Sequence, residues 1–184
     1  TGEEEDIAAE ERLTALATEY DGNLVGPSSQ GIINFPDGVA ASFSPSLDFI
    51  DPPEGPTSFI TQSGALGGAL TTSLLEDGIG LNKWVSTGSE ADLESLDFLS
   101  YFAEDPTTGV VAGFLEGFQD GRKLIEIKRT EAGIEMPIVV VKVGQSETAR
   151  DAVSSHTGKV AGQHEVYEAV FNETGVITAD GLDQ

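Results

Sequence analysis

The sequence predicts an α/β fold in which a doubly wound parallel sheet carries helices on both faces. Continuous apolar runs of strand length alternate with amphipathic runs of helical period through most of the chain. Short turns that contain glycine separate these runs, as is typical of strand–helix units in parallel sheets. Because 39% of the residues are hydrophobic and fall within the runs, the chain can bury a core despite its high charge.

The first 56 residues depart from this pattern. Residues 7–19 carry apolar side chains at helical spacing, and residues 23–27 predict a short strand. One helix and one strand cannot bury a core alone, so we expect residues 1–30 to be the end of an upstream domain. Short extended pieces follow from residue 31 to 43, and four prolines between positions 45 and 56 mark residues 31–56 as a connecting segment.

Residues 57–184 form the main domain in this prediction. Strands are expected at 57–61, 81–86, 107–115, 137–143 and 175–179. Helices are expected at about 64–76, 90–102, 120–132 and 165–173. Ligands of open α/β sheets bind outside the carboxyl ends of the strands, so the loops that follow the strands are where a site is expected.

Several small or charged residues follow the expected strands directly. They are Ser63-Gly64-Ala65, Gly88-Ser89, Glu116-Gly117, Gly144 and the loop that holds His156. The turn at Ser63, Gly64 and Ala65 would present backbone N–H groups and the positive end of a helix dipole, which suits phosphate. In the alternative interpretation, these small residues only let the helix pack close to the sheet.

His156 lies in a small, polar loop with the sequence Ser-Ser-His-Thr-Gly-Lys-Val-Ala-Gly from residue 154 to 162. An imidazole in such a loop is a candidate nucleophile or general base. Glu116 could hold one ring nitrogen as N–H and leave the other free to attack. The alternatives are a solvated histidine and an exposed acid at a strand end. A serine hydrolase using Ser63 and His156 is disfavoured, because residues 62–65 lack the G-x-S-x-G spacing.

The charge of the chain limits its partners. It has 32 acidic and 9 basic residues and a net charge of −23, which argues against nucleic acid and anionic membranes as partners. The acids are scattered along the chain, which favours adaptation to high salt. The absence of cysteine excludes disulfides and thiolate ligands, and we expect no metal site. No apolar run reaches about 18 residues and no leader is visible, so we expect a cytoplasmic protein.

A series of short motifs runs in order along the chain. They are Gly26-Pro27, Gly31-Ile32-Ile33-Asn34, Gln62-Ser63-Gly64-Ala65-Leu66, Ser86-Thr87-Gly88, Ala91-Asp92, Asp105-Pro106-Thr107, Leu115-Glu116-Gly117, Lys142-Val143-Gly144, Ser155-His156-Thr157-Gly158 and Ala161-Gly162. Together they resemble the NDP-forming acyl-CoA synthetases, which are relatives of succinyl-CoA synthetase. The resemblance covers essentially the whole chain, and the Ser-His-Thr-Gly loop carries most of it.

The resemblance implies a flavodoxin-like ligase domain at 57–184, preceded at 1–30 by the end of a CoA-binding Rossmann domain. The reaction it implies converts acyl-CoA, ADP and phosphate into free acid, CoA and ATP through an acyl phosphate and a phosphohistidine. By position, His156 would accept the phosphoryl group and Glu116 would orient it. The turn at residues 63–65 would bind the phosphoryl group, and Gly88 with Ser89 would line the acyl or phosphate pocket.

The same resemblance implies further components. CoA and ADP/ATP would be substrates, and Mg²⁺ is expected at a nucleotide site outside this chain. The partners would be the upstream Rossmann domain and an ATP-grasp domain or beta subunit, in a homo- or hetero-oligomer, and this piece alone would be inactive. The chain departs from the family at Ser28-Ser29, where Asn-Cys is usual, and at Ser89, where Asn is common. The alternative is a non-catalytic acyl-CoA-binding regulatory module built on the same domain.

Overall fold

The computed structural model describes residues 4–44, 53–130, 135–143 and 164–179. The helices are α1 (Glu4–Glu19), α2 (Gly64–Glu76), α3 (Ser95–Glu104), α4 (Gly121–Arg129) and α7 (His164–Thr174). The strands are β1 (Gly31–Asn34), β2 (Val39–Ser42), β3 (Glu54–Thr61), β4 (Leu81–Ser86), β5 (Val110–Leu115), β6 (Ile138–Lys142) and β7 (Ile177–Ala179).

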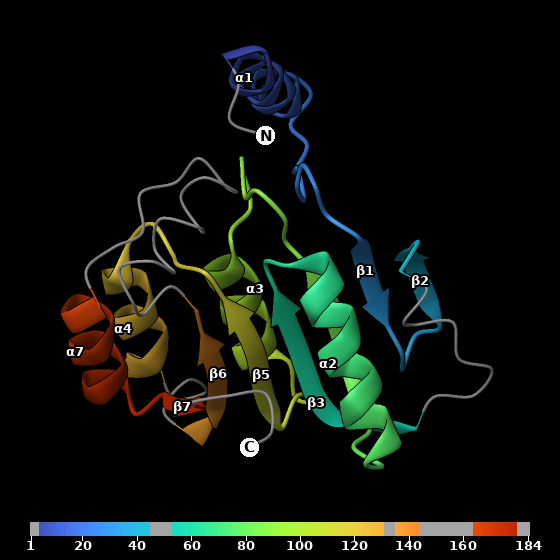
Figure 1. The fold of residues 1–184 in the computed structure, drawn as a ribbon, viewed down its shortest axis with the longest axis vertical. Coiled ribbons are helices and arrows are strands. Elements are labelled where there is room, and N and C mark those ends of the chain that lie inside the picture. Colours follow the sequence, from blue (N-terminus) through green and yellow to red (C-terminus); the bar gives the residue numbers. More distant parts are fainter. Residues whose placement is uncertain (1–3, 45–52, 131–134, 144–163, 180–184) are drawn as a thin grey trace.

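The strands form one sheet in the order β2-β1-β4-β3-β5-β6-β7 (Figure 1). Strands β4, β3, β5, β6 and β7 are parallel neighbours, which confirms the predicted doubly wound, flavodoxin-like arrangement. The hairpin β1–β2 extends this sheet with antiparallel strands, since Ile33 lies opposite Trp84 of β4. The sheet is therefore mixed and not wholly parallel, because residues 31–42 join the parallel core at its β4 edge.

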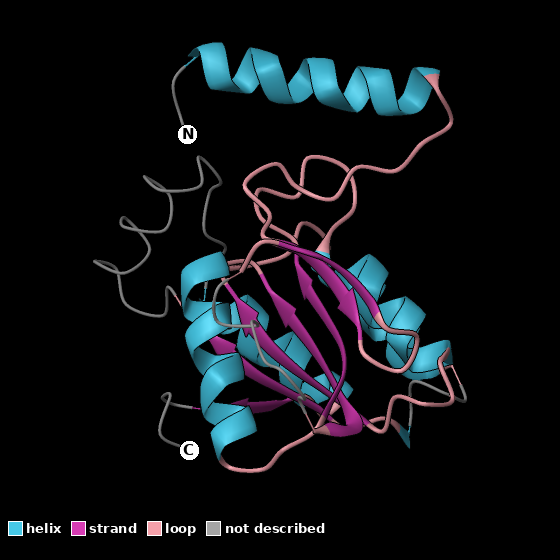
Figure 2. Ribbon diagram, turned by 90° about the vertical axis from the view of Figure 1, so that its right-hand side faces the viewer, coloured by secondary structure: helices cyan, strands magenta, loops and turns pink. Residues whose placement is uncertain are grey.

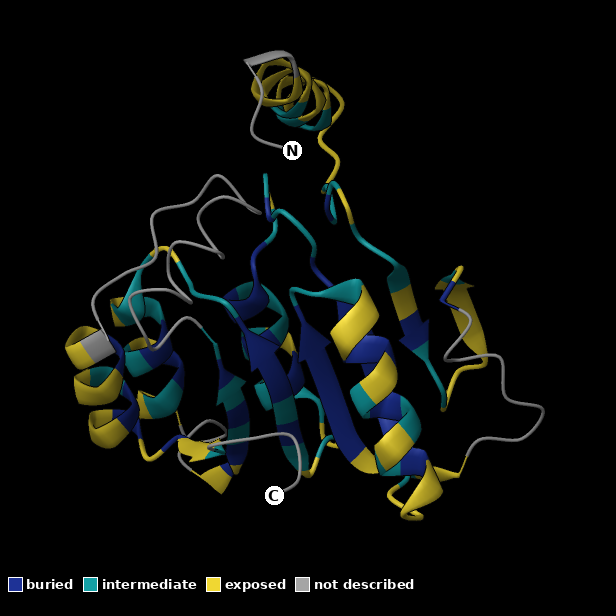
Figure 3. Cartoon of the chain, viewed as in Figure 1, coloured by how far each residue is buried: buried dark blue, intermediate teal, exposed yellow. Residues whose placement is uncertain are grey.

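Helices cover both faces of the sheet (Figures 1 and 2). On one face, α3, α4 and α7 enclose the larger core, in which Leu99, Leu124 and Phe171 meet the strands. On the other face, α2 covers a smaller cluster that includes Phe59 and Trp84. The central strands are almost fully buried (Figure 3), as their continuous apolar sequences require.

Helix α1 stands apart from the sheet (Figures 1 and 2). Its apolar side chains are largely exposed: Ile7 by 53%, Leu13 and Leu16 by 42% each. A hydrogen bond from Thr14 Oγ1 to the Ala91 carbonyl, at 3.3 Å, connects it to the loop after β4. The helix was predicted correctly, but it contributes little to the core of this domain.

The strand predicted at 23–27 is wrong. Within the part of the chain that the structure describes, this segment pairs with no strand and is hydrogen-bonded to the loop after β4. The amides of Ser89 and Ala91 donate to the carbonyls of Pro27 and Gly26, at 2.8 and 2.9 Å. Because its neighbour is irregular backbone and not a strand, the segment follows that loop without forming a regular ladder.

The helix predicted from residue 90 begins only at Ser95. Glu90 has a φ of 56°, a left-handed conformation that cannot belong to the helix. Its carboxylate is buried and accepts hydrogen bonds from the Ser95 amide and from Thr87 Oγ1, both at 2.9 Å. The residue therefore caps the helix from outside and does not extend it.

A cluster of buried polar side chains lies at the amino end of the sheet, and β5 begins at Val110 and not at residue 107 as predicted. Lys83 of β4 forms an ion pair with Asp105, and both side chains are about 10% exposed. Asp105 also accepts hydrogen bonds from the amide and the hydroxyl of Thr107, at 3.0 and 2.7 Å. The turn at 105–108 replaces the first residues of the strand predicted at 107–115.

Candidate active site

The carboxyl ends of β3, β4, β5 and β6 lie side by side in the sheet. The loops that follow them carry Ser63, Gly88, Glu116 and Val143 in turn. Backbone hydrogen bonds join neighbouring ends: the Thr87 amide donates to the Thr61 carbonyl at 2.8 Å, and the Val143 amide to the Leu115 carbonyl at 3.0 Å. These four loops therefore lie at the same edge of the sheet. His156 and Gly144 lie outside the described residues.

The turn after β3 begins helix α2. Ser63 is the N-cap residue, and its Oγ accepts the Leu66 amide at 3.5 Å. Thr61 Oγ1 fixes the turn by donating to the Ser63 carbonyl at 2.6 Å. Gly64 and Ala65 are thus the first residues of the helix, where backbone N–H groups lack intrahelical acceptors. This edge of the sheet therefore carries the positive end of the α2 dipole.

The small residues of this turn also serve close packing. A Cβ on Gly67 would lie 2.3 Å from the Thr61 side chain, and a Cβ on Gly64 would lie 2.7 Å from the Gln30 side chain. A larger residue at Gly67 would push α2 away from β3, whereas one at Gly64 would displace the Gln30 side chain. Close packing at Gly67 is thus observed, and phosphate binding at Ser63, Gly64 and Ala65 stays a prediction.

Glu116 follows β5 and is half-buried. Its backbone is held by Gln62, the residue that precedes Ser63. The amides of Glu116 and Gly117 both donate to Gln62 Oε1, at 2.5 and 3.1 Å, and Gln62 Nε2 donates to the Gly117 carbonyl at 2.6 Å. The turn that begins α2 and the loop that carries Glu116 are thus joined directly. Gln62 opens a motif of the family resemblance, but its contact with Glu116 could not be predicted, because the adjacency of β3 and β5 is not visible in the sequence.

Lys142 is the last residue of β6, and its buried side chain lies beside the loop that carries Glu116. Its side chain lies with Nζ 4.5 Å from the Tyr167 ring centre, and Nζ donates to the Glu116 carbonyl at 2.8 Å and to the Val143 carbonyl. Burial lowers the pKa of the Lys142 ammonium to about 8, although the Glu116 carboxylate acts in the opposite direction. A lysine in this state can lose or gain its proton near neutral pH.

Gly88 and Ser89 form a tight contact with the segment 26–29. Gly88 has a φ of 62°, and a Cβ there would lie 2.1 Å from the Pro27 carbonyl oxygen. Ser29 Oγ donates to the Ser86 carbonyl at 2.5 Å and accepts the Gly31 amide at 2.9 Å. The positions where the chain departs from the family pattern therefore lie together, beside the end of β4.

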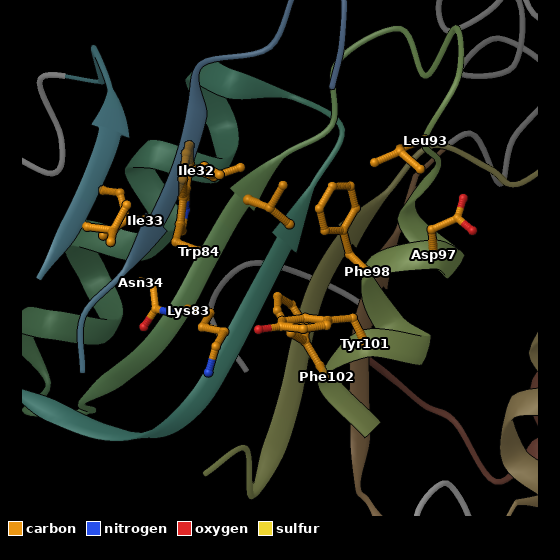
Figure 4. A pocket seen from close by; sticks show the side chains of 12 residues that line it. Ile32, Ile33, Asn34, Lys83, Trp84, Leu93, Asp97, Phe98, Tyr101 and Phe102 are labelled. Atoms are coloured by element: carbon orange, nitrogen blue, oxygen red, sulfur yellow. The ribbon is translucent and has the colours of Figure 1, made fainter. Parts of the chain in front are cut away.

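A separate apolar groove lies between β1, β4 and α3 (Figure 4). It has a volume of about 410 Å³, and its lining includes Ile32, Val85, Leu93, Phe98, Tyr101 and Phe102. Its charged side chains are engaged in ion pairs, Lys83 with Asp105 and Asp97 with Lys123. Small-molecule sites combine apolar walls with polar groups that can bind the ligand, so the carboxyl edge is the better candidate for chemistry.

Among the described residues, no group of three or more His, Cys, Asp or Glu side chains is arranged to hold a metal ion. No helix among the same residues is long and apolar enough to cross a membrane.

The topology and the loop positions define a flavodoxin-like α/β domain whose candidate site lies at the carboxyl edge of its sheet. The family described as "Succinyl-CoA ligase like flavodoxin domain" matches residues 54–184. The chain belongs to this family.

Curated relatives extend the similarity to nearly the whole chain. The chain is 38% identical to the acetate–CoA ligase [ADP-forming] I subunit alpha of Pyrococcus furiosus, over 96% of this chain and 37% of that protein. It is also 38% identical to acetate–CoA ligase [ADP-forming] I of Archaeoglobus fulgidus, over 95% of this chain and 25% of that protein. The chain thus spans only about a quarter to two fifths of the length of these relatives.

A solved structure agrees with this assignment. Acetyl-coenzyme A synthetase 1 of Ca. Korarchaeum cryptofilum, in complex with phosphate and ADP, is 36% identical and superposes with a TM-score of 0.86. The match covers 95% of this chain and 37% of that one. The ATP citrate lyase of Methanothrix soehngenii, at 16% identity and a TM-score of 0.69, shares the fold.

Proposed function

We propose that this chain is the phosphohistidine-carrying part of an NDP-forming acyl-CoA synthetase, which converts acyl-CoA, ADP and phosphate into acid, CoA and ATP. The relatives at 38% identity are named as ADP-forming acetate–CoA ligases, which supports this ligase class and these substrates. The observation that carries the proposal is the position of Glu116, which is tied through Gln62 to the start of α2. A carboxylate and a helix N-terminus then lie on neighbouring strand ends.

In this mechanism, His156 accepts the phosphoryl group and Glu116 orients the imidazole. A carboxylate that accepts the N–H of one ring nitrogen keeps the other nitrogen unprotonated and stabilises the ring when it becomes cationic. The amides of Gly64 and Ala65, in the first turn of the helix that Ser63 caps through the Leu66 amide, would bind the anionic oxygens of the transferring group. Phosphoryl transfer depends mainly on such positioning and charge stabilisation, so these roles suffice for the step.

We propose that residues 1–30 belong to an upstream CoA-binding domain and that Gly88 and Ser89 line the acyl or phosphate pocket. We also propose that residues 31–56 lead from the upstream domain into the domain at 57–184, through the hairpin β1–β2 that joins the sheet. The exposed apolar side chains of α1 support the first assignment, because such a surface normally packs against another unit. An ATP-grasp domain or beta subunit would bind ADP with Mg²⁺, and the complete enzyme would act in a salt-rich cytoplasm.

The proposal is tested with the complete protein that contains this chain. Formation of ATP from acetyl-CoA, ADP and phosphate should be abolished in His156→Ala and retained in His164→Ala, the matched control at the only other histidine. Unchanged ATP formation in His156→Ala would refute the role of His156.

A non-catalytic acyl-CoA-binding regulatory module is a second candidate. It is supported by the clustered departures at Ser28, Ser29 and Ser89, because the Ser89 amide bonds directly to the Pro27 carbonyl at 2.8 Å. Altered residues on both sides of one contact are consistent with a changed site. A complete protein that binds acetyl-CoA, yet forms no ATP and carries no phosphoryl group, would establish this second function.

A further inference from the structure

The peptide groups around Glu116 are held almost entirely by two side chains. Glu116 N, Gly117 N and the Gly117 carbonyl bond to Gln62, and the Glu116 carbonyl accepts a hydrogen bond from Lys142 at 2.8 Å. Two successive residues directly after a strand, Glu116 and Gly117, therefore have all four of their backbone polar groups paired. The direction in which the Glu116 side chain leaves the backbone is fixed by these contacts.

The side-chain carboxamide oxygen of Gln62 accepts as many hydrogen bonds as its two lone pairs allow. An amide oxygen has two lone pairs, and here each receives one backbone N–H, while the amide nitrogen donates to a carbonyl. The opposite orientation of the amide group would place N–H groups against N–H groups, so the network determines the orientation. Glutamate could not donate to the Gly117 carbonyl, and asparagine would be too short by one methylene.

Gln62 is itself anchored on both sides. The backbone N–H of Gln62 donates to the Phe114 carbonyl of β5 at 3.2 Å, and the next residue, Ser63, caps helix α2. On the far side of the loop, a Cβ on Gly117 would lie 2.7 Å from the Tyr167 hydroxyl. The loop is therefore enclosed between Gln62 and α7 and has little freedom to shift.

We propose that Gln62 is a positioning residue for Glu116: its carboxamide sets the distance between the Glu116 carboxylate and the amino end of α2. This inference rests on the proposed function, because Glu116 has a task only where a histidine receives a phosphoryl group. Gln62 touches neither the phosphoryl group nor the histidine in this account and acts through the backbone of Glu116. Its loss should slow phosphoryl transfer and leave nucleotide binding unchanged.

The test measures the rate at which γ-labelled ATP phosphorylates the complete protein. Gln62→Met keeps the length of the side chain and removes the three hydrogen bonds, and should slow labelling by about 10- to 100-fold, the range found when an orienting partner is removed. Gln119→Met is the matched control, because the Gln119 side chain is exposed in the same loop. This control should label at the wild-type rate, and the KM for ATP should be unchanged in all variants.

A double-mutant comparison separates positioning from general support of the fold. In a Glu116→Gln background, Gln62→Met should cause little further loss, because a residue that acts through Glu116 has nothing left to position. An equal loss in both backgrounds would overturn the inference and show a general structural role. Labelling at the wild-type rate in Gln62→Met would overturn it as well.

A second variant of Gln62 tests the same role if the first one fails to fold. If Gln62→Met fails to fold, Gln62→Glu retains the acceptor oxygen but replaces the donation to Gly117 with a repulsive contact between two oxygens, and it should label several-fold more slowly. An unchanged rate in Gln62→Glu would overturn the inference. The proposed function fails separately, when the wild-type protein shows no labelling of His156 at all.

Discussion

Replacing Gly88 with alanine tests how tightly the loop after β4 is held against the segment 26–29. The left-handed φ of 62° costs a residue with a Cβ about 1–2 kcal/mol. The new Cβ would also lie 2.1 Å from the Pro27 carbonyl oxygen and 2.7 Å from the Ser28 carbonyl carbon. These are backbone atoms that cannot rotate away, so we expect a further cost of about 1–3 kcal/mol. Urea unfolding of the chain at fixed salt concentration, followed by Trp84 fluorescence, measures the total.

Gly38→Ala is the matched control for this prediction. Gly38 has nearly the same φ, 64°, but a Cβ there would meet no atom within 4 Å. Its substitution should therefore cost only the backbone term, about 1 kcal/mol. Equal losses of unfolding free energy in Gly38→Ala and Gly88→Ala would refute the close contact between the two segments.

Three further predictions concern charge. Asp105→Asn should lower the unfolding free energy by about 3 kcal/mol at neutral pH, because it leaves the buried Lys83 ammonium without its ion-pair partner. Asp120→Asn is the control and should have little effect, because Asp120 forms an exposed ion pair with Arg122. Burial alone would raise the pKa of Asp105, but hydrogen bonds from Lys83 and Thr107 outweigh it and lower the pKa. The advantage of wild type over Asp105→Asn should therefore be complete at neutral pH and shrink as the pH falls below about 4, which acid unfolding curves measure. Folding lowers the pKa of Lys142 to about 8, so above this pH the unfolded chain binds more protons than the folded chain. The unfolding free energy of wild type should therefore rise relative to that of Lys142→Met, by up to about 1.4 kcal/mol per pH unit between about pH 8 and 10. Because the chain has a net charge of −23, salt should screen its self-repulsion, and the urea concentration at the midpoint of unfolding should rise between about 0.1 M and 1 M KCl. A fall in this midpoint would refute the adaptation to high salt.

The parallel core was predictable because its strands are buried on both faces and read as continuous apolar runs. Sequence periodicity could not show that β1 would pair with β4, since the Ile33 and Trp84 positions lie far apart in the chain. The helix start was misplaced for a local reason, because the left-handed backbone of Glu90 depends on the buried bonds of its carboxylate to Thr87 and Ser95. The first error comes from a tertiary contact between distant segments, and the second from hydrogen bonds between residues close in sequence, which periodicity does not show.

The candidate site was only partly visible in the sequence. Glu116 could be selected because strand ends in α/β sheets line the ligand crevice, and the structure places it there. Gln62 and Lys142 stand within motifs of the family resemblance, but no role could be assigned to them, because it depends on which strands are neighbours and on how deeply each side chain is buried. The motif Asp105-Pro106-Thr107 resembled a family signature, yet its ion pair with Lys83 stabilises the amino end of the sheet. A motif shared with a family therefore does not by itself indicate a catalytic residue.

The role of His156 is tested by identifying the residue that carries the phosphoryl group. The complete protein is labelled with γ-labelled ATP in molar salt, the labelled residue is mapped by mass spectrometry, and the stability of the label in acid and in base is compared. We expect a label on His156 that is lost in acid, survives in base, disappears in His156→Ala and weakens in Glu116→Gln. A complete enzyme that forms acyl-CoA without any label on His156 would refute the phosphohistidine mechanism.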